Sequence, residues 1–158
     1  MRILNVIMSV AIILILPACN KNNEEQMKTN EIFQKGQKAE SNFTGTAWVE
    51  MLSVDNANFD TQVYNVTFEP GCRNYWHSHP GGQLLLVTSG EGYYQEKDGQ
   101  IRLIKPGDVV EIKPDVIHWH GATPDSEFVH IGISTQVAKG AAVWYGPVSD
   151  DDYNSFKG

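Results

Sequence analysis

The residues best able to do chemistry in this chain are its five histidines. Four of them form two His-x-His pairs, and the full set is His77, His79, His118, His120 and His130. Side chains alternate between the two faces of a β-strand, so both members of a pair point the same way. Five separate core histidines would each need a hydrogen-bonding partner. One shared interior site explains them more economically.

A glutamine follows the first histidine pair. Pro80, Gly81 and Gly82 interrupt the strand after His79, and Gln83 begins the next apolar run, "QLLLV". A bend at these three residues can return Gln83 toward the interior that the histidines face. Imidazole nitrogens and a neutral amide oxygen together form a donor set suited to a borderline divalent metal ion.

The elements that must position these residues are strands. Seven short segments are rich in β-branched or aromatic residues, and turn signals such as "HPGG" and "KPGD" separate them: residues 47–52, 61–68, 83–89, 92–97, 100–104, 108–112 and 127–134. Asp98-Gly99 predicts a two-residue hairpin turn. Such closely spaced strands, without helical periods between them, predict an antiparallel sandwich or barrel. Only "VSDDDYNSF" favours a helix, which Ser149 would cap.

Composition limits the function classes. The 158 residues suffice for one domain with additional segments. The net charge is −7, with no basic patch, so a nucleic-acid partner is not expected. The two cysteines, Cys19 and Cys72, do not form a disulfide framework, and Cys72 is interpreted as a half-buried thiol without chemistry.

The N-terminus predicts export. An apolar run after Arg2, too short for a comfortable membrane span, indicates a signal peptide over residues 1–18. The ending "LPAC" resembles the bacterial lipoprotein box, which implies that Cys19 is lipidated and becomes the new N-terminus; ordinary secretory cleavage is the alternative. Residues 19–41 are polar and predict a flexible tether, followed by one domain over 42–158. By resemblance to the sorting rule of Gram-negative lipoproteins, Asn20 favours the outer membrane, so we expect a lipid-anchored protein of the bacterial envelope (outer membrane or periplasm).

The spacing of the site residues resembles the cupin family. The segment from Gly71 through His77, His79 and Gln83 to Gly90 is similar to the first cupin motif, in which glutamate usually stands at the Gln83 position. Pro106-Gly107-Asp108 followed by His118 resembles a degenerate second motif. The resemblance spans roughly residues 43–156 and implies an all-β, cupin-type antiparallel barrel (jelly roll) with a short C-terminal helix.

The chain is most similar to a group of small cupins. "TFEPG", "VTSGEG" and "HWHGATP" resemble manganese-dependent hydroxynitrile lyases and carboxymuconolactone-decarboxylase-related cupins, which also carry glutamine at this position. The resemblance implies His77, His79, Gln83 and His118 as ligands of one divalent ion, with Mn expected and Fe, Ni, Co or Zn as alternatives. A neutral glutamine leaves such an ion a stronger Lewis acid than a glutamate would.

His120 and His130 correspond to pocket histidines implicated in proton transfer in the lyases. We predict one of them as the base and favour His120, because "HWH" ties it to a ligand strand; a core or ligand-orienting role is the alternative. The chain departs from those lyases at Asn74 and at Tyr75, whose ring is expected to fill pocket volume.

Three functions remain open at this point. A metal-dependent lyase would act on a small hydroxy or carbonyl substrate. A metal-dependent oxygenase would use open positions beside three histidines. A non-catalytic cupin would bind a small ligand in the envelope. The resemblance also implies a homodimer.

Overall fold

The structure is a computed structural model that describes residues 32–54 and 57–157. The predicted signal peptide, the lipidation site Cys19 and most of the predicted tether lie outside the described residues. Within the described ranges, no helix is both long enough and apolar enough to cross a membrane.

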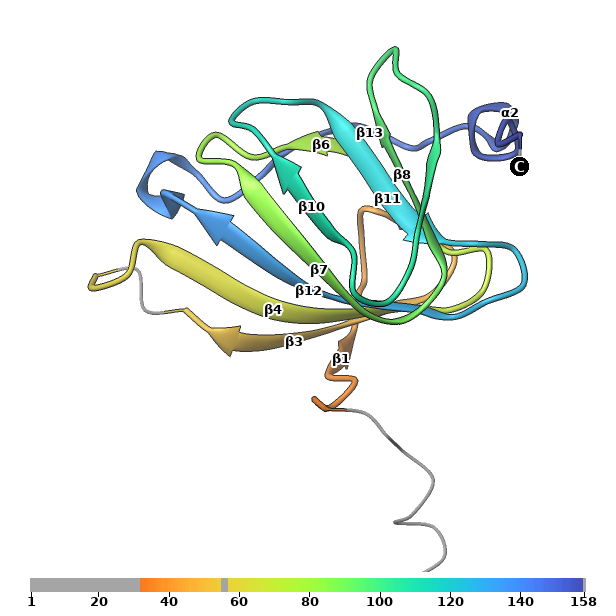
Figure 1. The fold of residues 1–158 in the computed structure, drawn as a ribbon. Coiled ribbons are helices and arrows are strands. Elements are labelled where there is room, and N and C mark those ends of the chain that lie inside the picture. Colours follow the sequence, from red (N-terminus) through yellow and green to blue (C-terminus); the bar gives the residue numbers. More distant parts are fainter. Residues whose placement is uncertain (1–31, 55–56, 158) are drawn as a thin grey trace, which may run out of the picture. The chain divides into compact units, whose positions relative to one another are not determined.

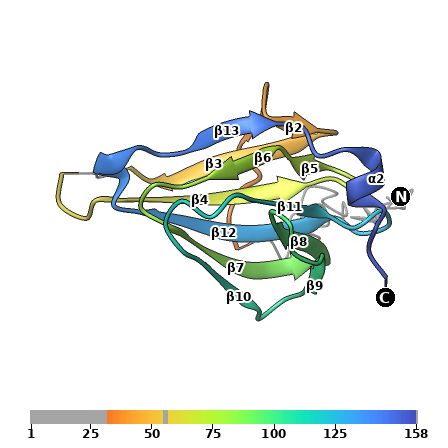
Figure 2. The same cartoon turned by 90° about the horizontal axis from the view of Figure 1, so that it is seen from above.

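Two antiparallel sheets form the domain. In spatial order, the first contains β1 (Gln37–Lys38), β3 (Ala47–Ser53), β4 (Thr61–Phe68), β12 (Phe128–Thr135), β7 (Gln83–Gly90) and β10 (Val109–Ile112). The second contains β13 (Val143–Gly146), β6 (Trp76–Ser78), β11 (His118–Ala122), β5 (Arg73–Asn74) and β2 (Phe43–Thr44), and β8 (Gly92–Glu96) joins β11 to β9 (Arg102–Ile104). Figures 1 and 2 show the sheets curling around a common interior. The predicted all-β barrel with a short C-terminal helix is confirmed.

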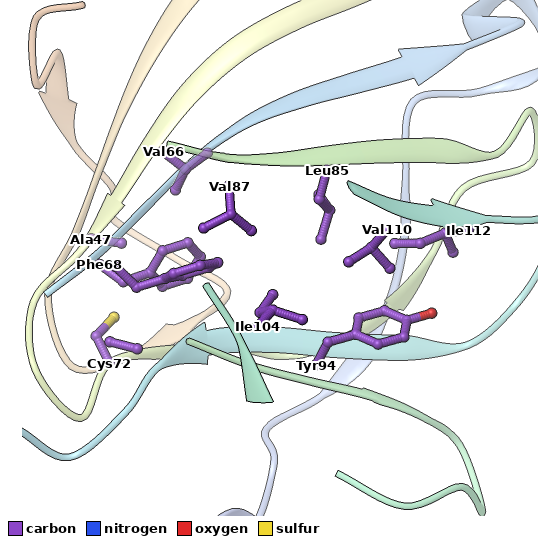
Figure 3. Packing of buried hydrophobic residues seen from close by; sticks show 12 residues of the cluster. Ala47, Val66, Phe68, Cys72, Leu85, Val87, Tyr94, Ile104, Val110 and Ile112 are labelled. Carbon is purple, nitrogen blue, oxygen red and sulfur yellow. The ribbon is translucent and has the colours of Figure 1, made fainter. Parts of the chain in front are cut away.

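The interior between the sheets is closely packed and apolar. Phe68 and Leu85 are fully buried, and Figure 3 shows Leu85 and Val87 opposite Ile104 and Tyr94. Full burial of one such aliphatic or aromatic side chain contributes about 1.5–3 kcal/mol. Cys72 belongs to this core and is 1% exposed rather than half-buried; burial raises the pKa of its thiol to about 12, so it is an inert packing residue.

Two local features differ from the prediction. Strand β1 lies within the segment predicted as tether, because Gln37 and Lys38 pair with Val49 and Trp48 of β3. The contacts of the domain therefore begin before residue 42. The turn between β8 and β9 is not a two-residue Asp-Gly turn, because the amide of Gly99 donates to the carbonyl of Glu96 and places Asp98 at φ +64°.

The C-terminal helix α2 (Asp150–Tyr153) forms as predicted. Ser149 accepts a hydrogen bond from the amide of Asp152, and three aspartates occupy the first turn, where the helix dipole favours negative charge. The Tyr153 hydroxyl donates to the carbonyl of Ala122, which fastens the helix to β11. Arg73 donates to the carbonyl of Val148 and anchors the segment before the helix.

Candidate metal site

Two neighbouring strands and the bend after β6 bring the candidate ligands together. His77 on β6 and His118 on β11 are directly paired across the second sheet. His79 lies just beyond β6, and Gln83 opens β7 in the first sheet. In Figure 1 the start of β7, the start of β4 and the end of β12 lie at the left end of the barrel. The predicted return of Gln83 toward the histidines therefore occurs.

Three histidines converge on one point. One ring nitrogen from each of His77, His79 and His118 lies within 4.8 Å of the other two, and all three residues are buried. The Gln83 Oε1 is 3.1 Å from His118 Nε2. The four residues predicted as ligands thus lie in one cluster, whose histidines could hold a divalent metal ion.

Backbone carbonyls set the tautomer of each clustered histidine. The Nδ1 atom of His77 lies 2.9 Å from the carbonyl oxygen of Tyr75. That of His79 lies 2.5 Å from the carbonyl oxygen of Ala141, and that of His118 lies 2.9 Å from the carbonyl oxygen of Val116. A carbonyl only accepts, so each Nδ1 carries the proton and each Nε2 keeps its lone pair. This is the arrangement that orients metal-ligating histidines in proteins.

The donor atoms fit a cation. With Nδ1 protonated, His118 Nε2 and Gln83 Oε1 are two acceptors facing each other at 3.1 Å. Two such lone pairs repel, whereas adjacent ligands of an octahedral ion lie about 3 Å apart. His79 Nε2 is buried and has no hydrogen-bonding partner among the described residues. A divalent cation would satisfy both groups at once.

The amide of Gln83 is held by a second contact. Its Nε2 donates to the Tyr64 hydroxyl at 2.6 Å, and this hydroxyl lies 2.9 Å from Ser134 Oγ. Ser134 Oγ in turn lies 3.3 Å from His79 Nδ1. Gly132 makes room for the tyrosine, because a Cβ at this position would collide with the Tyr64 ring. This chain of contacts aims Oε1 of the glutamine at the cluster.

Burial keeps the cluster uncharged. It lowers the pKa of His118 to about 4 and the pKa of His79 below its usual value. The pKa of His77 is well below its usual value, because of burial and the nearby His118 and His79. Neutral imidazoles near pH 7 are the form that binds metal.

A cavity of about 220 Å³ opens beside the cluster. No acidic side chain is among the described residues that line it: Phe43, Val49, Met51, Gln62, Tyr64, Val66, Phe68, Asn74, His77, His79, Gln83, His120, Ser134, Ala141, Ala142 and Trp144. Trp144 on β13 stacks on the His77 ring, with centroids 4.7 Å apart. Tyr75, which was expected to fill pocket volume, is absent from this lining. The cavity therefore suits a small ligand with an apolar body.

The two remaining histidines occupy different positions. His120 lines the cavity, and its ring lies parallel to that of His118 with centroids 5.8 Å apart. His130 is fully buried between Phe68 and Phe128 and contacts His120 edge-on at 4.8 Å. Burial lowers the pKa of His130 to about 4. Both ring nitrogens of His130 and Nδ1 of His120 are buried without a hydrogen-bonding partner among the described residues.

Several residues that shape the site were not predicted from the sequence. Tyr64 and Ser134 share the inward face of their strands, which strand alternation could have indicated. The Ala141 carbonyl and the stacked Trp144 come from the segment around β13, and its pairing with β6 leaves no periodic signal in the sequence.

Known proteins share this architecture. Residues 64–133 match the family model described as a cupin domain. The crystal structure of a cupin-like protein from Thermotoga maritima is 58% identical, has a TM-score of 0.76, and aligns with 78% of this chain and 95% of its own. A DMSP lyase from Ruegeria pomeroyi, 19% identical with a TM-score of 0.57, aligns with 66% of this chain and 54% of its own, and shares the fold.

The chain is also similar to an enzyme. It is 40% identical over 111 residues to (R)-mandelonitrile lyase from Granulicella tundricola, and the alignment covers 70% of this chain and 85% of that one. These similarities agree with the fold of two curled antiparallel sheets and with the buried three-histidine cluster. The chain belongs to the cupin family.

Proposed function

We propose that this protein is a metal-dependent lyase that acts on a small hydroxy or carbonyl compound. The observation that carries the proposal is the convergence of three neutral imidazoles and one neutral amide oxygen beside an apolar cavity. The similarity to (R)-mandelonitrile lyase supports the same class of reaction. Because the donor set brings no negative charge, it would not neutralise a bound divalent ion, which would supply Lewis acidity at the site.

The residues divide the work between binding and proton transfer. His77, His79, Gln83 and His118 would hold the ion, which supplies Lewis acidity when bound. The apolar walls, among them Phe43, Phe68 and Trp144, would hold the organic part of the substrate and exclude water.

Cleavage requires one proton transfer. The substrate hydroxyl loses its proton to a histidine, the carbon bond to the leaving group breaks, and its electron pair departs with a small anion. A carbonyl product remains. His120 and His130, with buried and unpartnered ring nitrogens, are the candidates for this transfer.

We further propose manganese as the ion, with Fe, Ni, Co and Zn to be compared. The decisive experiment measures turnover of mandelonitrile by protein reconstituted with each metal, under argon and in air. Manganese-dependent release of benzaldehyde under argon supports the lyase. Oxygen uptake that requires iron would instead establish an oxygenase, and metal binding without turnover of any cyanohydrin tested would favour a ligand-binding cupin.

The setting of the protein is also a proposal. "LPAC" before residue 20 supports a chain anchored by lipid on Cys19 in the bacterial envelope. We expect a homodimer, on the family resemblance and because β10 and β13 end the two sheets with exposed apolar side chains, Val109 and Val143. Sedimentation of the purified protein tests the oligomeric state.

A further inference from the structure

Asn74 makes two contacts with one histidine. It lies on β5, beside β11, and both Asn74 and His120 are 3% exposed. The side-chain oxygen of Asn74 accepts a hydrogen bond from the backbone amide of His120 at 2.9 Å. The side-chain nitrogen lies 2.9 Å from Nε2 of the His120 ring.

These two contacts determine which ring nitrogen carries the proton. A backbone amide only donates, so the atom of Asn74 that faces it must be the oxygen. The other end of the side chain is then the NH₂ group, which donates to Nε2. A neutral imidazole that accepts at Nε2 bears its hydrogen on Nδ1.

The hydrogen on Nδ1 has no acceptor in the described part of the protein. Nδ1 is buried and unpartnered, and the ring that carries it lines the cavity beside the histidine cluster. An unsatisfied buried donor costs free energy. A bound ligand with an acceptor atom can recover this cost.

We propose that Asn74 is a positioning residue that fixes His120 as a neutral hydrogen-bond donor to the ligand in the cavity. A nitrogen that already carries a hydrogen cannot take the proton of a substrate hydroxyl, so His120 binds a carbonyl or anionic oxygen and is not the base. A neutral imidazole in such an electrophilic role has precedent in triosephosphate isomerase. Only the assignment of the ligand as the carbonyl product rests on the proposed lyase function; the ring state of His120 does not.

The test is nitrogen-15 NMR of histidine-labelled protein, metal-free and zinc-loaded, near neutral pH. The signals of His120 are assigned by their loss in His120→Gln. We expect a proton on Nδ1 and a bare Nε2 in the wild type. A wild-type proton on Nε2 overturns the proposal, and this result needs no folded variant.

Asn74→Asp should reverse the tautomer of His120. A carboxylate can accept from both the backbone amide and the ring, so His120 should gain a proton on Nε2 while the other four histidines keep their signals. Asn65→Asp is the control, because Asn65 is an equally buried amide whose nitrogen donates to the Gln34 carbonyl. An Nε2 that stays bare in a folded Asn74→Asp protein contradicts the proposal.

Two probes test the ligand class. Benzaldehyde carries an acceptor oxygen and toluene does not, while both carry one aromatic ring. Benzaldehyde should shift the His120 Nδ1 signal of the zinc-loaded wild type, and toluene should leave it in place. Equal shifts would show that His120 donates nothing to the ligand. Absence of cyanohydrin turnover, by contrast, would remove the lyase proposal and leave the tautomer result standing.

Discussion

The Gln83 amide uses both of its ends. Its nitrogen donates to Tyr64, and its oxygen faces the histidine cluster. An alanine would lose both contacts but would leave room for water, which can replace a neutral oxygen ligand. A glutamate could still face the cluster, because the Tyr64 hydroxyl can rotate to donate to it.

These contacts rank the ligand variants. His77→Ala, His79→Ala and His118→Ala should each lose most of the bound ion, since each removes a strong nitrogen donor. Gln83→Ala should lose less, and Gln83→Glu should bind at least as tightly as the wild type while lowering any Lewis-acid activity. Metal content per chain, measured by elemental analysis after dialysis, checks the order. The control is His130→Leu, which should keep its metal; a His118→Ala protein with full metal content would exclude the four-ligand site.

His130 makes the stability of the fold depend on pH. Its pKa is about 4 in the folded protein and about 6.5 in an unfolded chain. Between these pH values His130 is protonated in the unfolded chain but not in the folded protein. The free energy of unfolding therefore falls as the pH drops from 6.5 to 4. The loss is about 3 kcal/mol for this residue. His130→Leu should flatten the dependence by that amount in denaturant titrations of metal-free protein.

A neighbouring substitution is the control for that measurement. Ile131→Val removes no titratable group, so it should shift the stability equally at every pH. If His130→Leu shows the same slope as Ile131→Val, His130 is not the source of the acid sensitivity. At pH 7 the leucine also removes two buried unpartnered nitrogens, and the variant should be at least as stable as the wild type.

At the scale of elements, β12 contributes to the site through Gly132, which leaves space for the Tyr64 ring. Gly132→Ala would place a methyl group against the Tyr64 ring and displace the hydroxyl that holds Gln83. We expect a loss of about 1–3 kcal/mol from overpacking and weaker metal retention. Unfolding curves and metal content together check this. Gly71→Ala is the contrasting variant, because a Cβ there meets no atom within 4 Å and only its φ of +78° is strained; it should destabilise the fold without releasing metal.

The strands flanked by clear turn signals were predictable, the short β9 and β10 among them, whereas the two-residue strands and β13 were not. Residues 61–68 were predicted with their observed bounds, because β-branched and aromatic residues run between clear turn signals. The two-residue strands, such as β1, and the exposed β13 have no alternating pattern and form because a distant partner is present.

The side chains of the histidine cluster were predictable from the sequence, but the backbone groups that orient them were not. Histidine spacing predicted that the members of each His-x-His pair share a face, because alternation along an extended chain is a local rule. The carbonyls that fix the histidine tautomers could not be predicted, since every residue has a carbonyl and only the fold selects Ala141, Val116 and Tyr75.

At the scale of the whole molecule, the proposed lipid on Cys19 would attach the protein to a membrane. If Cys19 carries lipid, Cys19→Ala should abolish labelling by a fatty-acid analogue and move the protein from the membrane fraction to the soluble fraction. The fold should be unaffected, since the described domain begins beyond this residue. Unchanged labelling of Cys19→Ala, compared with Cys72→Ala as the control, would contradict the anchor.

The segment around β13 contributes two contacts to the histidine cluster, although it contains none of the candidate ligands. All four donors precede residue 119 in the chain, yet the carbonyl that aims His79 and the ring that backs His77 belong to Ala141 and Trp144. During translation the donors therefore leave the ribosome before the carbonyl that orients His79 and the ring that stacks on His77. A chain ending before Ala141 would possess every donor but would lack the carbonyl that orients His79 and the ring that stacks on His77. We therefore expect the cluster to reach its full arrangement only after the segment around β13 has been synthesised.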